Sequence, residues 1–321
     1  MKPKLSLDEY LRSPVFAGGL SLEDRQLLSG ICYTLAEVPQ KAFRFSSPSP
    51  LTKVNKFGDQ QTAADVIAED HIRGFLRMNP HVLSFASEEH PVLEHNPWIS
   101  GKVVLFDPLD GSAGAGSNVT TGAFVSIYDE RLDGKTPADQ TAAIMATFGT
   151  RIHITICTGR RRGVSRFVLD DDTLYLDKRI GPLLPDAKFI APGDAFTFAL
   201  TRPETIRRWS TQGMKLRYSG CMAADLSYIL ENGSGVYFYL GNLLQEEGKL
   251  RFLYECGPAA FILKEAGGHA SNGGVPILDI PIQGLQQKSQ FIGGSRAEVR
   301  WIERDLRDEE FGEALEAMRA E

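Results

Sequence analysis

Residues 102–112 limit the possible fold and function of this chain most, because an apolar strand ends there abruptly in a pair of carboxylates. Residues Lys102–Phe106 are largely apolar and rich in β-branched side chains, as a buried strand is, and a proline and a glycine then force a turn. Asp107 and Asp110 are held on that turn, where their oxygens can converge on a hard divalent cation. The backbone amides of Gly111 and Ser112 can face a phosphate oxygen. The stretch therefore predicts a metal and phosphate site at the end of a strand.

A DPLDG sequence by itself also fits a plain tight turn, so the metal interpretation depends on the rest of the chain. Acidic residues recur upstream in Asn55–Gln61, at Asp65 and Asp70, and in Ser87–Glu89. Downstream, Lys249–Glu255 has the alternation of a strand, with a lysine, an arginine and a glutamate on one face. Asp70 fits a solvated helix surface better than a ligand, since no motif includes it. Together these segments favour a metal site over a plain turn.

The length of 321 residues suits two closely packed domains of mixed α and β structure. A stretch rich in proline and glycine at 181–188 predicts the boundary between an N-terminal α+β metal-binding domain, 1–187, and a C-terminal α/β domain, 188–321. Helices are expected over 7–40, 59–78, 194–213, 222–230 and 258–266. Strands are expected over 82–85, 102–106, 121–128, 142–148, 152–157, 165–169, 173–176, 235–240 and 250–254. The strands between 121 and 176 suggest an antiparallel meander, with Asp170–Asp172 as a hairpin turn and not a metal site.

Charge and hydropathy exclude several classes of protein. The net charge of −6 argues against a nucleic-acid surface, and the basic run Arg160–Arg162 is too isolated to change this. No segment approaches about 18 uninterrupted apolar residues, and Met1–Tyr10 lacks the apolar core of a signal peptide. The four cysteines have no CxxC spacing, which predicts reduced, mostly buried thiols. A cytoplasmic protein without a nucleic-acid or membrane partner is expected, with import into an organelle and removal of a leader as the alternative.

In order and approximate spacing, five segments of this chain resemble class I fructose-1,6-bisphosphatase and its relative sedoheptulose-1,7-bisphosphatase. The segments are Gly58–Gln60, Ser87–Glu89, Phe106–Ser112, Arg217–Met222 and Lys249–Cys256. The resemblance runs from residue 50 to residue 300. Flanking residues such as Phe57 and the ending Ser289–Ser295 look more like the sedoheptulose enzyme.

The resemblance implies a five-layer αβαβα sandwich of the sugar-phosphatase superfamily, with the site between its halves and the sugar phosphate held by the C-terminal half. It implies an enzyme that uses Mg²⁺, roughly two or three ions per site with Mn²⁺ as an alternative. The reaction would remove the 1-phosphate of sedoheptulose 1,7-bisphosphate, fructose 1,6-bisphosphate or both. A homodimer or homotetramer is also implied, because in some relatives the arginine at the position of Arg217 reaches the neighbouring subunit's site.

The resemblance also implies a role for each matching residue. The metal ligands would be Glu88, Glu89, Asp107, Asp110, Glu255 and the carbonyl oxygen of Leu109. The attacking water would be oriented and activated by Asp59 and Asp65, with Glu89. The reacting phosphate would rest on Gly111 and Ser112, and the distal phosphate and sugar on Asp194, Arg217, Tyr218, Met222, Tyr239 and Lys249. The structural alternatives are a solvated loop for Glu88 and Glu89, a surface charge for Arg217 and core packing for Met222.

Two departures from the family pattern keep other functions open. Ala113–Ser117 follows the turn where the family usually has polar residues, so side-chain donors are missing there. Asp194 stands where relatives tend to place an asparagine, and a carboxylate facing a phosphate is unfavourable unless it turns away or is paired. One alternative is a superfamily phosphatase that acts on another sugar or inositol phosphate. The other is a catalytically silent relative that binds sugar phosphates.

Overall fold

The computed structural model describes residues 4–15, 19–43, 50–54, 60–159, 162–193, 202–241 and 247–307, with the backbone alone for 50–54 and 60. Asp59 and Asp194, which were expected at the site, lie outside the described residues, as does the first part of the helix expected over 194–213.

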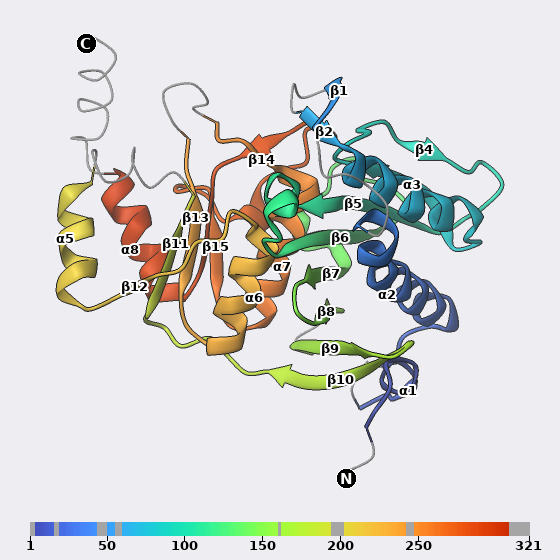
Figure 1. Cartoon of the computed structure of the whole chain (residues 1–321), viewed down its shortest axis with the longest axis horizontal. Helices are drawn as coiled ribbons and strands as arrows, with labels where there is room; N and C mark the ends of the chain where they lie inside the picture. The colour runs from blue at the N-terminus through green and yellow to red at the C-terminus, as the bar shows by residue number, and fades with distance from the viewer. Residues whose placement is uncertain are drawn as a thin grey trace.

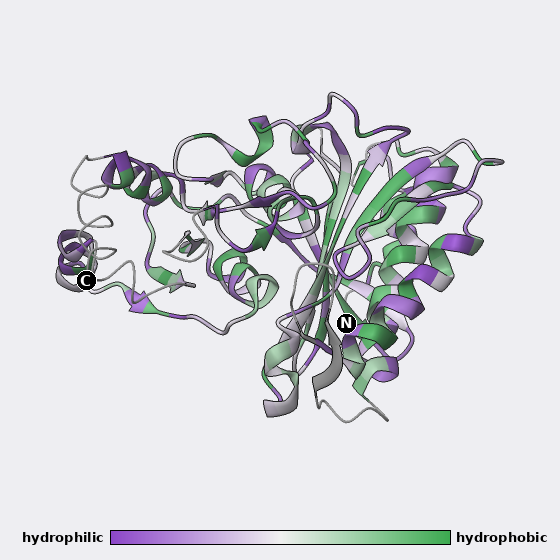
Figure 2. Cartoon of the chain, turned by 90° about the horizontal axis from the view of Figure 1, so that it is seen from above, coloured by the Kyte–Doolittle hydropathy of each residue, from purple (hydrophilic) through white to green (hydrophobic). Residues whose placement is uncertain are grey.

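Helices and sheets alternate in layers (Figure 1). An eight-stranded sheet is covered on one face by α1 (Leu7–Arg12), α2 (Leu22–Phe43) and α3 (Ala63–Met78). Between this sheet and a five-stranded sheet lie α6 (Met222–Asn232) and α7 (Gly257–Glu265), and α5 (Pro203–Thr211) and α8 (Arg296–Arg307) cover the far side. The strands are mainly hydrophobic, whereas the outer helices also carry hydrophilic residues (Figure 2). This order of layers confirms the expected αβαβα sandwich.

The large sheet has the strand order β10-β9-β8-β7-β6-β5-β3-β4 and is antiparallel except for the pair β3 and β5. Its strands are β3 (Val82–Ser87), β4 (Glu94–His95), β5 (Lys102–Asp110), β6 (Thr121–Asp129), β7 (Gln140–Phe148), β8 (Ile152–Cys157), β9 (Val164–Asp170) and β10 (Thr173–Ile180). The expected meander and the turn after Asp170 are confirmed. Both faces are buried, because Val104 and Phe106 of β5 pack toward α2 and α3 while Val103 and Leu105 pack toward α6 and α7. Because β5 is buried on both faces, the residues at its C-terminal end are held in a fixed position.

The smaller sheet has the order β12-β11-β13-β17-β15, and two-stranded sheets flank the site. Its strands are β11 (Phe189–Pro192), β12 (Lys215–Leu216), β13 (Val236–Tyr239), β15 (His269–Ser271) and β17 (Phe291–Gly294). The small pairs are β1 (Pro50–Val54) with β2 (Gln60–Thr62), and β14 (Leu250–Arg251) with β16 (Lys288–Ser289). The division into domains at 187 stays a prediction. Within the described part of the chain, each helix is too short or too polar to cross a bilayer.

The strand expected over 250–254 is wrong beyond Arg251. Phe252–Cys256 forms a π-helical turn that runs directly into α7, and the amide of Gly257 donates to the carbonyl oxygen of Phe252, five residues earlier. Pro258 has no N–H to donate, so the tighter α-helical bond is not available at that position. Glu255 therefore projects from a helical turn and not from a strand.

Candidate active site

The end of β5 positions two carboxylates beside each other. Asp107 and Asp110 are 3% and 8% exposed, and the pairing with β6 shifts register between them, so the strand is irregular at this point. The amide of Leu109 donates to Asp107 Oδ1 at 2.9 Å. Gly111 follows with φ +76°, and a Cβ there would lie 2.6 Å from the Cβ of Cys221. The turn therefore requires glycine both for its backbone conformation and for space.

Asp110 is oriented by the N-terminus of α6. Its Oδ2 accepts from the amide of Ala223 at 2.7 Å and from the thiol of Cys221 at 3.3 Å. A helix N-terminus favours negative charge, so this contact holds the carboxylate in one orientation.

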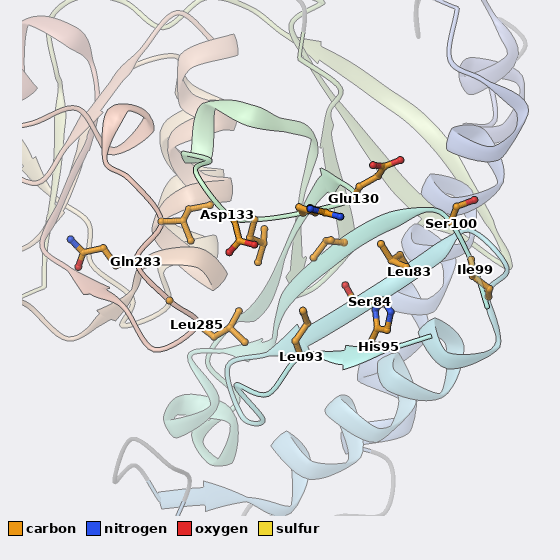
Figure 3. Close-up of a pocket in the computed structure, with 15 residues that line it drawn as sticks. Leu83, Ser84, Leu93, His95, Ile99, Ser100, Glu130, Asp133, Gln283 and Leu285 are labelled. Carbon is orange, nitrogen blue, oxygen red and sulfur yellow. The ribbon is translucent and has the colours of Figure 1, made fainter. Parts of the chain in front are cut away.

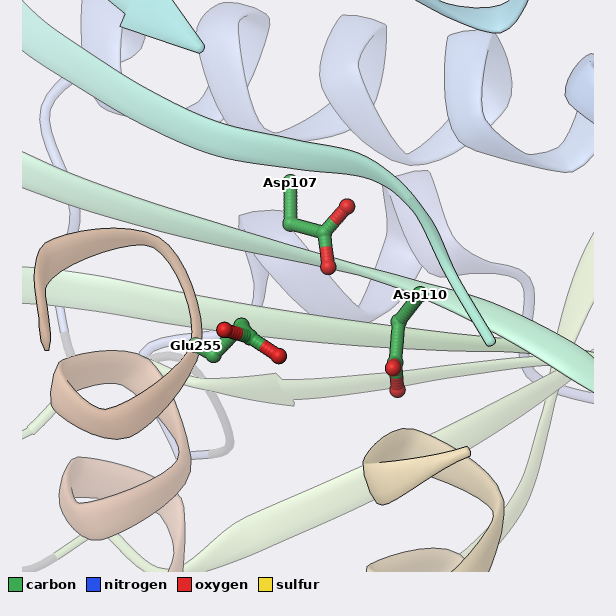
Figure 4. Close-up of side chains that lie close together, drawn as sticks. All are labelled: Asp107, Asp110 and Glu255. Atoms are coloured by element: carbon green, nitrogen blue, oxygen red, sulfur yellow. The ribbon is translucent and has the colours of Figure 1, made fainter. Parts of the chain in front are cut away.

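Glu255 reaches the same place from the π-helical turn. Its Oε2 accepts from the amide of Arg251 at 2.6 Å. Asp107, Asp110 and Glu255 each offer an oxygen, and these oxygens lie within 4.8 Å of one another. Figure 4 shows the three side chains gathered between β5 and the helical turn. Buried oxygens at this separation can share one hard divalent cation.

Glu88 and Glu89 follow β3 and add two carboxylates to this group of acidic residues. The amide of Glu88 donates to the carbonyl oxygen of Phe106 at 3.0 Å, which ties this turn to β5. Arg251 Nε lies 3.2 Å from Glu88 Oε1, and Gln61 Nε2 donates to Glu89 Oε2. Both glutamates line a cavity of about 290 Å³ together with the three carboxylates at the end of β5 and on the π-helical turn.

Burial and mutual repulsion make these carboxylates costly to ionise. Burial first, then the charge of neighbouring carboxylates, raises the pKa values of Glu88 and Asp107 well above their ordinary range. Burial likewise raises the pKa of Asp110, and raises that of Glu255 to about 7. A bound cation would offset this repulsion, and the donor set of carboxylate oxygens fits Mg²⁺.

Asp65 lies on the first turn of α3 and lines the same cavity. Its Oδ2 accepts from the amide of Thr62 at 2.6 Å and from the Thr62 hydroxyl at 2.8 Å, so it also caps the helix. Burial raises its pKa, while hydrogen bonds from Thr62 and Ser112 act in the opposite direction. The carboxylate is thus fixed beside the loop that follows β5.

Positive and aromatic side chains line the same cavity as the carboxylates. They are Tyr218, Tyr237, Tyr239, Lys249, Arg251 and Lys288. Lys249 Nζ lies 4.8 Å from the centre of the Tyr239 ring. Both oxygens of the buried Asp225 accept from the amide of Ser219, at 3.0 and 3.2 Å, which fixes the loop that carries Tyr218. The positive and aromatic side chains can bind an anion, and the carboxylates can bind cations.

The cavity brings together most of the residues expected from the sequence. Its lining includes Asp65, Glu88, Glu89, Asp107, Leu109, Asp110, Gly111, Ser112, Tyr218, Met222, Tyr239, Lys249 and Glu255. Arg217 is not among them, because it is exposed and its Nη1 donates to the carbonyl oxygen of Leu216 at 2.7 Å. Sequence reasoning gave no role to Tyr237, Arg251 or Lys288. The sequence did place Arg251 on the same alternating face as Lys249. Lys288 could not be found in this way, because it reaches the cavity only through the pairing of β16 with β14.

A second cavity, of about 670 Å³, does not share this chemistry. It lies against the start of β3 and β5 and is lined by Leu83, Leu93, Ile99 and Leu285, with Glu130 and Asp133 at its side (Figure 3). None of the carboxylates gathered at the end of β5 reaches it. The smaller acidic cavity is therefore the candidate active site.

Known proteins resemble this chain over both halves. The family model for the N-terminal domain of fructose-1,6-bisphosphatase matches residues 29–175, and the model for its C-terminal domain matches residues 188–306. A class 1 fructose-1,6-bisphosphatase of Syntrophotalea carbinolica is 34% identical, with 96% of this chain and 95% of the relative covered. A chloroplastic sedoheptulose-1,7-bisphosphatase of Triticum aestivum is 31% identical, with 79% of this chain and 65% of the relative covered. The holo crystal structure of Leishmania major fructose-1,6-bisphosphatase shares the fold, with a TM-score of 0.85, 22% identity and coverage of 95% of this chain and 99% of that one.

Proposed function

The chain belongs to the class 1 fructose-1,6-bisphosphatase family, whose members are phosphoric monoester hydrolases, and we propose that it removes the 1-phosphate of a ketose bisphosphate. One observation supports this most, namely that six buried or half-buried carboxylates and a set of lysine, arginine and tyrosine side chains line one cavity. Both sedoheptulose 1,7-bisphosphate and fructose 1,6-bisphosphate are proposed substrates, since one extra hydroxymethylene changes binding by only about 1 to 3 kcal/mol.

The proposed cofactor is Mg²⁺, because every ligand in the acidic cluster is a hard oxygen. Asp107, Asp110 and Glu255 would hold one ion, and Glu88 and Glu89, with the Leu109 carbonyl, would complete roughly two or three sites. When bound, such ions neutralise phosphoryl oxygens and lower the pKa of a coordinated water.

The protein groups around this cluster would orient the reactants. Asp65, held by Thr62 at the start of α3, would accept a proton from the attacking water, with Asp59 as a second expected acceptor. The amides of Gly111 and Ser112 would hold the reacting phosphate, since both residues line the cavity directly after the carboxylates of β5. A bound cation would favour the ionised form of Glu88 and Asp107, whose pKa values are raised by burial and by the neighbouring carboxylates.

The distal phosphate would lie among Tyr218, Tyr239 and Lys249. Arg217 is exposed beside the edge strand β12 and does not line this cavity, so its proposed role is to bind the distal phosphate in the site of a second subunit. A homodimer or homotetramer therefore belongs to the proposal, and sedimentation of the purified protein tests it. The cytoplasm is the proposed location.

Phosphate release from a panel of sugar, inositol and nucleotide phosphates, with millimolar Mg²⁺, tests the function. We expect release from the two ketose bisphosphates, at one phosphate per molecule, and loss of release after chelation. No release from any sugar bisphosphate would refute the proposal. Tight binding of an unhydrolysed bisphosphate in calorimetry would instead indicate a catalytically silent relative, and preference for an inositol phosphate would move the chain to another branch of the superfamily.

A further inference from the structure

A buried glutamate lies directly behind the acidic cluster without lining the cavity. Glu69 is on α3, one helical turn after Asp65, and is 6% exposed. Its Oε1 accepts a hydrogen bond from the Ser87 hydroxyl at 2.6 Å. Ser87 is the last residue of β3 and immediately precedes Glu88.

The Ser87 hydroxyl closes the turn that carries Glu88 and Glu89. Its oxygen accepts from the amide of His90 at 2.9 Å, and the Ser87 amide lies 3.4 Å from the carbonyl oxygen of His90. A hydroxyl has one proton to donate, and here that proton is given to Glu69. The orientation of the hydroxyl, and with it the His90 contact, therefore depends on an acceptor at position 69.

A carboxyl at this position is costly for the fold. Burial raises the pKa of Glu69, and the Ser87 hydrogen bond and the Arg73 charge only partly oppose it. Arg73 Nη1 lies 3.6 Å from Glu69 Oε1, but the same guanidinium also pairs with Glu94. A well-packed apolar side chain avoids such a penalty, so stability alone does not account for a glutamate here.

We propose that Glu69 is a positioning residue of the metal site, acting through Ser87. It fixes the turn from Ser87 to His90, so that the carboxylates of Glu88 and Glu89 are presented to the cavity before a metal ion arrives. This inference rests on the proposed metal site, but not on the identity of the sugar. Removing a hydrogen-bond partner behind a metal ligand typically costs about 10- to 100-fold in metal affinity.

Calorimetric titration of metal-stripped protein with Mg²⁺ alone tests this inference. Glu69→Leu removes the acceptor at similar volume, Ser87→Ala removes the donor, and Glu69→Gln keeps an acceptor oxygen. Asp70→Asn is the matched control, because it changes the neighbouring exposed carboxylate on the same helix. We expect Glu69→Leu and Ser87→Ala to weaken Mg²⁺ binding about tenfold or more, and Glu69→Gln and Asp70→Asn to stay within about threefold of wild type.

Stability and kinetics separate positioning from general damage. Glu69→Leu removes a buried carboxyl but leaves the Ser87 hydroxyl without its acceptor, so its metal-free melting temperature should fall by only a few degrees. In activity assays, the Mg²⁺ concentration for half-maximal rate should rise while kcat at saturating Mg²⁺ stays near wild type. The double variant Glu69→Leu/Ser87→Ala should bind Mg²⁺ no more weakly than either single variant, because both substitutions remove the same hydrogen bond.

Wild-type Mg²⁺ affinity in both Glu69→Leu and Ser87→Ala overturns the inference, and so does a Glu69→Gln variant as weak as Glu69→Leu. If Glu69→Leu does not fold, the test is the Mg²⁺ affinity of Ser87→Ala compared with that of the control variant Asp70→Asn. A wild-type protein that binds Mg²⁺ but hydrolyses no sugar bisphosphate refutes the proposed activity, while the comparison of affinities still decides the role of Glu69.

Discussion

The buried acidic cluster should make the stability of the metal-free protein fall as pH rises. Glu255 is 7% exposed, and burial with the nearby Asp110 charge raises its pKa from 4.5 to about 7. Between these two values the folded protein keeps a proton that the unfolded chain has released. The raised pKa therefore contributes stability that is complete below pH 4.5 and is lost as pH passes through about 7. Glu88 and Asp107 act in the same direction, because their pKa values are raised as well.

The size of the effect follows from Glu255 alone. Its shift corresponds to roughly 3 kcal/mol, since one pKa unit is worth about 1.4 kcal/mol. For large domains about 1 kcal/mol changes the melting temperature by roughly 2 to 4 °C, so we expect a fall of several degrees. At the proposed site Mg²⁺ would bind the ionised carboxylates and displace these protons, so its stabilisation should grow with pH across the same range.

Melting temperatures measured with a chelator and with millimolar Mg²⁺, from pH 5 to pH 8.5, test this reasoning. Glu255→Gln is the matched variant, because it removes the titrating group at similar size and should flatten the pH dependence of the metal-free protein. A metal-free melting temperature that stays level or rises from pH 5 to pH 7 contradicts the argument. A Mg²⁺ stabilisation that is larger at pH 5 than at pH 8 contradicts it as well.

Three substitutions probe separate parts of the site. Asp65→Asn should lower kcat by roughly 10²-fold with KM largely kept, because it removes a proton acceptor while an amide oxygen can still cap α3; a near-normal kcat would exclude Asp65 from the mechanism. Gly111→Ala should lower both the melting temperature and kcat, since its φ is +76° and a Cβ would lie 2.6 Å from that of Cys221. Gly213→Ala is the control for backbone strain alone, because Gly213 has a φ of +66° and no atom within 4 Å of an added Cβ. An equal fall in melting temperature in both variants would show that the contact with Cys221 does not matter. Lys249→Met should raise KM for both bisphosphates about tenfold or more with a smaller change in kcat, and an unchanged KM would remove Lys249 from the distal phosphate site.

Local patterns in the sequence predicted most of the elements that build the site. The end of β5 was predictable because an apolar run, a proline and a glycine act over neighbouring residues. The meander from β6 to β10 followed from alternation and turn residues, which also act at short range. The layered sandwich and the roles of the site residues came from the resemblance of the motifs to one family. The cavity lining contains all of those site residues except the ones outside the described chain and Arg217.

Tertiary structure alone decided how these elements meet. Glu255 comes from a π-helical turn, and the sequence suggested a strand because alternating residues over seven positions do not reveal the hydrogen bond from Gly257 to Phe252. Lys288 joins the cavity only through pairing of β16 with β14, and Glu69 reaches Ser87 only because α3 packs against the end of β3. Such contacts join residues far apart in the chain, so their energy depends on packing and burial that no local pattern contains. Composition and motif order thus determined which chemistry the chain carries, and the packing of the layers decided which side chains share the cavity and which, like Arg217, face solvent.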